Sequence, residues 1–184
     1  MLIEVRWHGR GGQGAVTAAE ILAHAAINEG KYAQAFPSFG PERRGAPVLA
    51  FNRFDEKPIW TRSDVYEPDV VVVLDPTLLK TINVVEGLKP NGILILNTSK
   101  KPGEVKEKYG FKSNFAIVNA TRIALDIIGV PIVNTSMLGA FVKATKILKL
   151  DSVLEAVKER FKGKIGERNI NAVTRAYHET IIVG

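Results

Sequence analysis

The sequence predicts an α/β fold: a Rossmann-like layered domain with a mainly parallel sheet and a helical C-terminal part packed on it. The chain opens with an alternating apolar stretch, a glycine-rich turn and an alanine-rich stretch of helical period. Short, almost wholly apolar runs follow, and such runs suit strands buried on both faces of a parallel sheet. From residue 136 onward, apolar residues recur at helical spacing. For a chain of 184 residues we expect one domain, spanning residues 1–184.

The predicted elements alternate along the chain. Residues 2–8 alternate apolar with polar side chains and predict a strand, and residues 15–28 predict a helix that Gly30 ends. Asp75 and Pro76 predict a turn that begins a further helix. Other strands are predicted at residues 32–36, 69–74, 92–96 and 115–118, with a hairpin made by 48–54 and 57–62. Helices are predicted at residues 120–128, 136–148, 154–161 and 171–182.

Charge and composition exclude several classes of protein. Lys and Arg outnumber Asp and Glu by 25 to 19, a net charge of +6, but the basic residues scatter without interleaved aromatics. We therefore expect no nucleic-acid partner. The absence of Cys excludes disulfides and iron–sulfur clusters held by thiolates. The charged first residues and the lack of an apolar run of ~18 residues favour a cytoplasmic protein without a membrane span.

The glycine-rich turn admits several interpretations. Gly9, Gly11 and Gly14 satisfy the G-x-G-x-x-G spacing between a strand and a helix, where a phosphate can approach free N–H groups. The acid that would hold a ribose is missing, because the first acid after the second predicted strand is Glu42. Ala15 and Val16 stand where a P-loop requires Lys and Ser or Thr. Because four glycines exceed what a tight turn needs, we favour close approach by an anionic ligand or by another subunit's backbone.

Four motifs carry a family resemblance. They are GRGGQG at 9–14, QAFPSFGPERRGAP at 34–47, PD at 68–69 with the valine run and Asp75, and NTSMLGA at 134–140. In this order the chain resembles the gamma subunit of pyruvate:ferredoxin oxidoreductases and related 2-oxoacid:ferredoxin oxidoreductases. The motifs span nearly the whole sequence.

The resemblance implies a multi-subunit enzyme with alpha, beta and delta partners. Such an enzyme converts a 2-oxoacid, coenzyme A and oxidised ferredoxin into acyl-CoA, carbon dioxide and reduced ferredoxin. Its thiamine diphosphate, magnesium and iron–sulfur clusters belong mainly to the other chains. This chain has no Cys and no Gly-Asp-Gly with a downstream Asn, so it agrees with that division and is expected to hold none of these cofactors alone.

Several residues are expected to make contacts, and none of them is assigned to catalysis or to a metal. The loop formed by Gly9, Gly11, Gly12, Gln13 and Gly14 is expected to receive a ligand or a partner subunit. Arginine forks suit carboxylates and phosphates, so the adjacent Arg43 and Arg44 are expected to contact a subunit or the phosphates of CoA. Asn134, Thr135 and Ser136 precede an apolar helix. They suggest N-capping, and the resemblance adds an interface role for Asn134 and Thr135.

Two alternatives remain at this level: an NAD-dependent dehydrogenase, or a stand-alone module that binds CoA or a similar nucleotide. The 2-oxoacid is also open, with pyruvate as the default beside branched-chain acids, 2-oxoglutarate and indolepyruvate.

Overall fold

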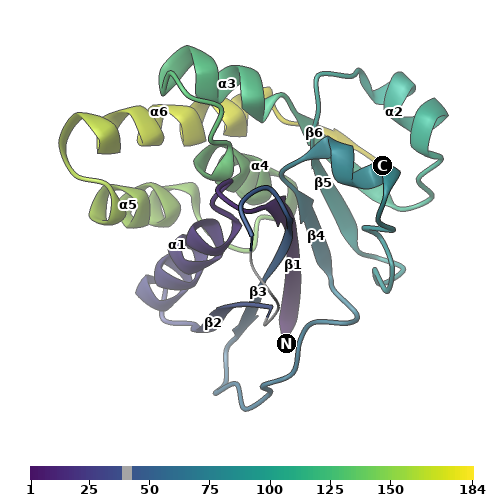
Figure 1. The fold of residues 1–184 in the computed structure, drawn as a ribbon. Coiled ribbons are helices and arrows are strands. Elements are labelled where there is room, and N and C mark those ends of the chain that lie inside the picture. The colour runs from purple at the N-terminus through teal and green to yellow at the C-terminus, as the bar shows by residue number, and fades with distance from the viewer. Residues whose placement is uncertain (39–42) are drawn as a thin grey trace.

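The computed structural model describes residues 1–38 and 43–184 of the chain. In that part, one seven-stranded sheet runs in the order β2-β3-β1-β4-β5-β6-β7 (Figure 1). The strands are β1 (Ile3–Arg10), β2 (Tyr32–Pro37), β3 (Pro47–Asp55), β4 (Val70–Val73), β5 (Ile93–Asn97), β6 (Asn114–Val118) and β7 (Ile181–Val183). The helices are α1 (Ala15–Asn28), α2 (Pro102–Tyr109), α3 (Ala120–Ile127), α4 (Asn134–Thr145), α5 (Leu150–Arg160) and α6 (Gly163–Glu179), with a 3-10 turn at Pro76–Lys80.

The centre of the sheet is parallel and its flanks are antiparallel. β1, β4, β5 and β6 pair in parallel, whereas β3 runs antiparallel to both β1 and β2, and β7 runs antiparallel to β6. The predicted α/β fold with a mainly parallel central sheet is thus confirmed. The segment Ala15–Asn28 is helical as expected, and the valine run forms the predicted buried strand.

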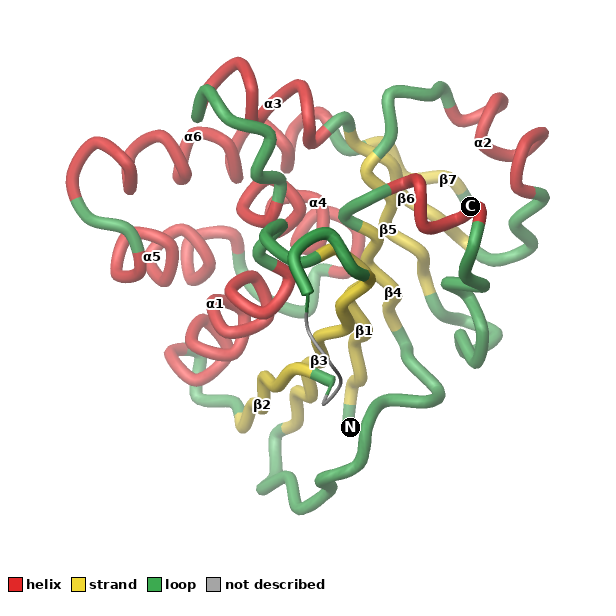
Figure 2. The backbone as a smooth tube through the Cα atoms, in the orientation of Figure 1, coloured by secondary structure: helices red, strands yellow, loops and turns green. Residues whose placement is uncertain are grey.

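Helices cover the two faces of the sheet unequally. On one face, α1 and α4 pack on the strands, and α3, α5 and α6 pack against these helices and one another. The 3-10 turn, α2 and the segment 81–92 cover the other face (Figures 1 and 2). The valines of β4 alternate between the two layers: Val70 and Val72 join the larger core, and Val71 and Val73 join the smaller one. Full burial of such a side chain contributes ~1.5–3 kcal/mol, which explains why this strand is apolar on both sides.

The predicted hairpin is wrong. β3 already has β1 on one side and β2 on the other, so neither edge of β3 is left for residues 57–62 to pair with it as a hairpin. Those residues form no strand, and Pro58 has no N–H to give to a ladder. Instead, the side-chain amide of Gln34 donates to the carbonyl oxygens of Ile59 (3.3 Å) and Thr61 (3.1 Å).

Two further differences lie in the C-terminal half. The helix predicted at 171–182 begins earlier, at Gly163, and ends at Glu179, and the β-branched residues after it pair with β6 as β7. The short helix α2 was not predicted, because only its Val105 is buried and it therefore lacks an apolar stripe. None of the helices in residues 1–38 and 43–184 is both long enough and apolar enough to cross a membrane.

A strip of buried polar side chains crosses the sheet on the face opposite α1. The Arg53 side chain is 1% exposed, and its Nε donates to Glu4 Oε1 at 2.8 Å. Arg6 donates to the carbonyl oxygens of Val84 and Glu86 and, through Nε, to His8 Nε2 at 3.1 Å. Burial and the neighbouring Arg6 charge lower the pKa of His8 to about 3. The Arg6 guanidinium therefore joins β1 to segment 81–92, and the neutral imidazole of His8 accepts one of its hydrogen bonds.

We expect His8 to make folding stability depend on pH. In the unfolded chain its pKa returns to ~6.5, so between pH 6.5 and 3 the unfolded state binds a proton that the folded state does not. This contribution to stability is complete above pH ~6.5 and is lost as the pH falls. The free energy of unfolding, measured with urea between pH 5 and 7, should change more steeply with pH in wild type than in His8→Gln. The glutamine keeps an acceptor for Arg6. His178→Gln, at an exposed histidine of α6 with no ion pair among the described residues, is the control. Equal slopes for wild type and His8→Gln would contradict the assignment.

Candidate functional site

The predicted site lies at the carboxyl end of the parallel strands. The turn from β1 into α1, Asp75 after β4 and the start of α4 come together there, together with residues 43–46 before β3 (Figure 2). Ligand sites of open α/β sheets form at this edge, where loops from different strands converge. The topology therefore brings together the motif at 9–14, the start of the motif at 134–140, Asp75 and the described end of the motif at 34–47. Asp69 lies at the other end of β4, where it accepts a hydrogen bond from Glu4 N.

Asp75 anchors the glycine loop to the neighbouring strand. Its Oδ2 accepts hydrogen bonds from Arg10 Nε at 3.1 Å and from Gln13 Nε2 at 2.9 Å. Its Oδ1 accepts from the backbone and side chain of Thr77, which begins the 3-10 turn. The Oε1 of Gln13 in turn accepts from Arg10 N at 2.7 Å. Each polar group of the Gln13 side chain thus has a partner inside the chain.

The charge state of Asp75 follows from these contacts. Burial alone would raise the pKa of Asp75, but the hydrogen bonds from Thr77 and Gln13 and the Arg10 charge together hold it below its usual value. The carboxylate is therefore ionised at neutral pH. It acts as an acceptor that orders the loop, and this state does not suit a proton donor.

Gly11 permits a close approach within the chain itself. A Cβ atom on Gly11 would lie 2.6 Å from the carbonyl oxygen of Arg43, a distance that real Cβ atoms essentially never show. The backbones are joined by hydrogen bonds from Gly11 N to Ala46 O (2.9 Å) and from Gly45 N to Gly11 O (3.3 Å). Arg10 Nη1 adds a bond to the Gly45 carbonyl at 3.2 Å. The arginine segment is therefore fastened to the glycine loop.

Gly14 permits a second close approach, to α4. Its φ is +81°, and a Cβ there would collide with the side-chain amide of Asn134. Asn134 is 6% exposed, and its Oδ1 accepts from the Thr135 N–H. Asn134 and Thr135 lie inside the first turn of α4, after Val133 at the N-cap position, so the capping interpretation is wrong.

Thr135 faces the interior of the chain. It is fully buried, and its Oγ1 donates to Asn169 Oδ1 of α6 at 2.7 Å. A direct contact between Thr135 and a partner subunit is incompatible with this burial. Thr135 instead fixes the start of α4, and this places the Asn134 side chain against the glycine loop.

Gly12 is the loop glycine that faces open space. Its φ is +90°, and a Cβ there would meet nothing within 4 Å among the described residues. It borders a depression of about 260 Å³ over the first turn of α1. The N-cap residue of α1 is Gly14, so no side chain caps the N-terminus of this helix. The free N–H groups of such a turn favour an anion or a carbonyl oxygen. Gly9 lies within β1, where an added Cβ would make ordinary van der Waals contacts with Ala15, Gln13 and Leu74.

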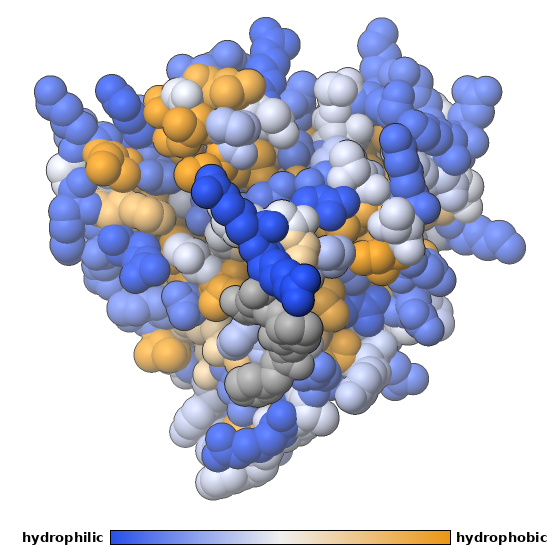
Figure 3. All heavy atoms as spheres, in the orientation of Figure 1, coloured by the Kyte–Doolittle hydropathy of each residue, from blue (hydrophilic) through white to orange (hydrophobic). Residues whose placement is uncertain are grey.

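Arg43 and Arg44 lie beside the loop and are exposed. Arg44 bridges to Gly11 through its backbone, and neither guanidinium bonds to any residue among 1–38 and 43–184. Hydrophilic side chains extend over the face of the molecule that Figure 3 shows. The central residues of the second motif, 39–42, lie outside the described part of the chain.

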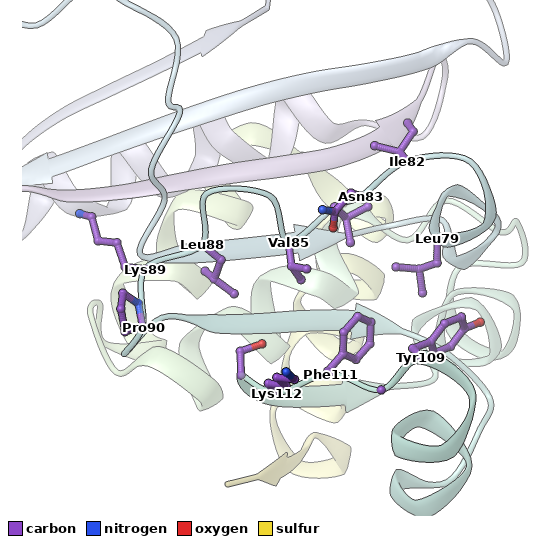
Figure 4. A pocket seen from close by; sticks show the side chains of 13 residues that line it. Leu79, Ile82, Asn83, Val85, Leu88, Lys89, Pro90, Tyr109, Phe111 and Lys112 are labelled. Carbon is purple, nitrogen blue, oxygen red and sulfur yellow. The ribbon is translucent and has the colours of Figure 1, made fainter.

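A larger hollow of about 530 Å³ lies on the opposite face of the sheet (Figure 4). Its lining is mainly apolar, with the stacked rings of Tyr109 and Phe111 on one side. Its charged lining residues are Lys89, which pairs with Asp69, and Lys112. It contains none of the predicted site residues and no acid–base pair. The described residues hold no group of three or more His, Cys, Asp or Glu side chains that suits a metal ion.

Comparison with known proteins places the chain in a family. The model of the pyruvate ferredoxin/flavodoxin oxidoreductase family matches residues 4–179. The chain belongs to this family. The resemblance expected from the four motifs is confirmed.

Relatives from several organisms match over nearly their whole length. The chain is 59% identical over 182 residues to the common gamma subunit of the pyruvate/ketoisovalerate oxidoreductases of Thermococcus kodakarensis, covering 98% of each chain. It is 54% identical over 180 residues to the pyruvate synthase subunit PorC of Methanocaldococcus jannaschii, again covering 98% of each. The crystal structure of the PORC subunit of pyruvate oxidoreductase from Thermotoga maritima superposes with a TM-score of 0.88 at 43% identity, covering 100% of this chain and 99% of that one. A gamma-type oxidoreductase subunit with this fold was the prediction, and these relatives confirm it.

Sequence reasoning missed the anchor of the site. Asp75 was interpreted as a turn residue. It does fill that role, but it also binds Arg10 and Gln13 across two strands. The signal was present in principle, because Arg10 and Asp75 follow two apolar runs that become adjacent parallel strands. Pairing them requires the strand order, which single-sequence periodicity does not supply.

We expect Asp75→Asn to destabilise the chain by about 1–2 kcal/mol. Hydrogen bonds to charged groups contribute ~1.5–3 kcal/mol, and the partial exposure of Arg10 reduces that figure. Because the pKa of Asp75 is lowered on folding, its contribution is present above pH ~3.9 and is lost at lower pH. Urea unfolding at pH 7 measures the loss, with the more exposed Asp126→Asn as the control at below ~1 kcal/mol. Equal stability of Asp75→Asn and wild type would contradict the anchoring role.

Proposed function

We propose that this chain is the gamma subunit of a multi-subunit 2-oxoacid:ferredoxin oxidoreductase, with pyruvate as the default substrate. The complex would convert the 2-oxoacid, CoA and oxidised ferredoxin into acyl-CoA, carbon dioxide and reduced ferredoxin. The observation that carries the proposal is the full-length match to relatives named as gamma or PorC subunits of pyruvate oxidoreductases.

The composition of the chain supports a division of labour among alpha, beta, gamma and delta subunits. With no Cys, this chain has no thiolates to ligate an iron–sulfur cluster. The proposal therefore assigns the clusters, and the thiamine diphosphate with its magnesium, to the partners. Ferredoxin would reach the complex through those chains. This chain would contribute contacts that complete the assembly and its substrate sites.

The candidate contact surface consists of Gly12, the first turn of α1, Arg43 and Arg44, with the 6% exposed Asn134 beneath it against Gly14. Two versions are proposed: the surface receives the backbone and carboxylates of a partner subunit, or it receives the phosphates of CoA. Guanidinium groups and free N–H groups suit both. The aromatic side chain of Phe36, near the same loop, packs on Phe51 with ring centroids 5.2 Å apart, so it is engaged inside the chain.

The two alternatives receive less support. A dinucleotide site needs an acid at the end of the strand after the first helix, and β2 ends in Pro37. β3 also separates β2 from β1, which moves the end of β2 about 10 Å away across the sheet. A stand-alone nucleotide-binding module would not be expected to match named enzyme subunits from end to end.

Co-purification tests the proposal. A tagged copy expressed in its native host should bring down larger partners that carry iron–sulfur absorption and reduce ferredoxin with a 2-oxoacid and CoA. The isolated chain should be colourless and inactive. Assays with pyruvate, a branched-chain 2-oxoacid, 2-oxoglutarate and indolepyruvate then identify the substrate. A chain that elutes alone from native extract, or that alone reduces NAD⁺, would overturn the proposal.

We expect Gly12→Val to disable the complex while the isolated chain still folds. A side chain at this open position would intrude on whatever meets the loop. Because φ at Gly12 is +90°, valine also adds backbone strain of ~1–3 kcal/mol. Gly12→Asn is therefore tested alongside it, since asparagine adopts positive φ with less strain. Assembly and turnover are the measurements, and thermal unfolding checks the fold. Wild-type turnover by both variants would reduce the loop to a simple turn.

Arg43→Ala/Arg44→Ala separates the two versions of the contact. If the arginines bind a subunit, assembly should weaken by about 2–5 kcal/mol, the usual cost of truncating one side of a buried charge pair. If they bind CoA, assembly should stay intact and the KM for CoA should rise about tenfold for each ~1.4 kcal/mol lost. Sedimentation and CoA titration measure the two effects. Unchanged assembly and unchanged CoA and 2-oxoacid kinetics would refute both.

A further inference from the structure

Strand β2 ends the sheet on one side and has β3 as its only strand neighbour in the described chain (Figure 1). In an antiparallel pair, residues alternate between those whose backbone groups bond to the neighbour and those whose groups point away from it. Ser38 N donates to Leu49 O, which continues the register and makes the even-numbered residues of β2 the bonded ones. The N–H and C=O groups of Ala33 and Ala35 therefore point to the outer edge. No described residue outside the sheet bonds to them.

This edge lacks the usual protection. Exposed edge strands are normally kept from pairing by charged side chains, bulges or very short length. β2 has six residues, Tyr-Ala-Gln-Ala-Phe-Pro, none of them charged, and only the terminal Pro37 lacks an N–H. At the other end of the sheet, β7 is only three residues long, so its edge offers little to a partner. An unprotected edge of this length is a liability in a free chain unless something covers it.

A groove runs along the same edge. It encloses about 490 Å³ and is lined by Ala33, Gln34, Ala35, Phe36, Thr61 and Arg62. The bonds from the Gln34 amide to Ile59 and Thr61 hold segment 59–61 against the strand. Trp60 lies between those two residues and is 82% exposed. Exposed Trp and Arg beside a groove are the residue types that dominate binding at protein interfaces.

We propose that an extended segment of another subunit of the complex pairs with β2 as an additional outer strand. Its backbone would bond to Ala33 and Ala35, its apolar side chains would pack on Trp60 and in the groove, and an acidic side chain would face Arg62. Arg62 forms no ion pair with a described residue, which favours an acidic partner segment. A second copy of this chain is disfavoured, because two molecules of net charge +6 repel each other and neither has an acid within β2. The inference rests on the proposed function, since it requires a complex.

Amide hydrogen exchange tests strand addition directly. The amides of Ala33 and Ala35 should exchange rapidly in the isolated chain and at least ~10-fold more slowly in the purified complex, as new ladder bonds form. If the complex forms but these amides stay unprotected, the inference fails while the proposed function survives. If no complex forms, both fail. If the isolated chain sediments as a dimer with these amides protected, a second copy is the occupant and the inference is overturned.

Variants provide a second, independent readout. Ala35→Pro removes an outward N–H without removing a bond to β3, so the chain should fold but assemble at least ~10-fold more weakly. Arg62→Glu should weaken assembly by reversing the charge at the groove. Ile165→Ser, which alters an exposed apolar residue on α6, is the matched control and should assemble normally. If Arg62→Glu and Ala35→Pro both assemble like this control, the inference is overturned. If Ala35→Pro does not fold, Arg62→Glu and the wild-type exchange measurement decide the question.

Discussion

The carboxylate of Asp75 is the contact on which the rest of the site depends. It receives Arg10 and Gln13 from the glycine loop, and it also begins the 3-10 turn through Thr77. With the loop held in this way, Gly11 lies against the backbone of residues 43–45 and Gly14 lies against Asn134. One ionised side chain at the end of β4 therefore fixes four segments that are distant in the sequence. These internal contacts leave Gly12, Arg43 and Arg44 exposed at the surface.

The glycines have two different roles. Gly11 and Gly14 are required by contacts inside the chain, because any Cβ there would collide with backbone or with a buried amide. Position 12 favours glycine because its φ is positive, and no described residue lies within 4 Å of where a Cβ would stand. The G-x-G-x-x-G spacing thus arises largely from packing between loops, and this explains how it can occur without the acid of a dinucleotide site. A glycine pattern of this kind indicates a crowded strand-to-helix turn first and a ligand only second.

The sequence predicted the central fold well, because burial on both faces leaves a clear mark on short strands such as Val70–Val73. The helix Ala15–Asn28 was predicted to the residue. The errors have a shared cause, since local period does not reveal which sheet edges are free. Both edges of β3 are already paired, so residues 57–62 form no strand there. The edge of β6 is free, and Ile181–Val183 pair with it as β7. At the site, the residue types were identified from motifs, but the roles of Asp75 and Thr135 depend on partners more than 30 residues away.

A structure of the assembled complex would show what lies over the glycine loop. We expect Gly12, Arg43 and Arg44 to contact another subunit or the phosphates of CoA, while Asp75 keeps its bonds to Arg10 and Gln13. A complex in which this surface faces open solvent, with neither protein nor CoA upon it, would contradict the proposed contact role.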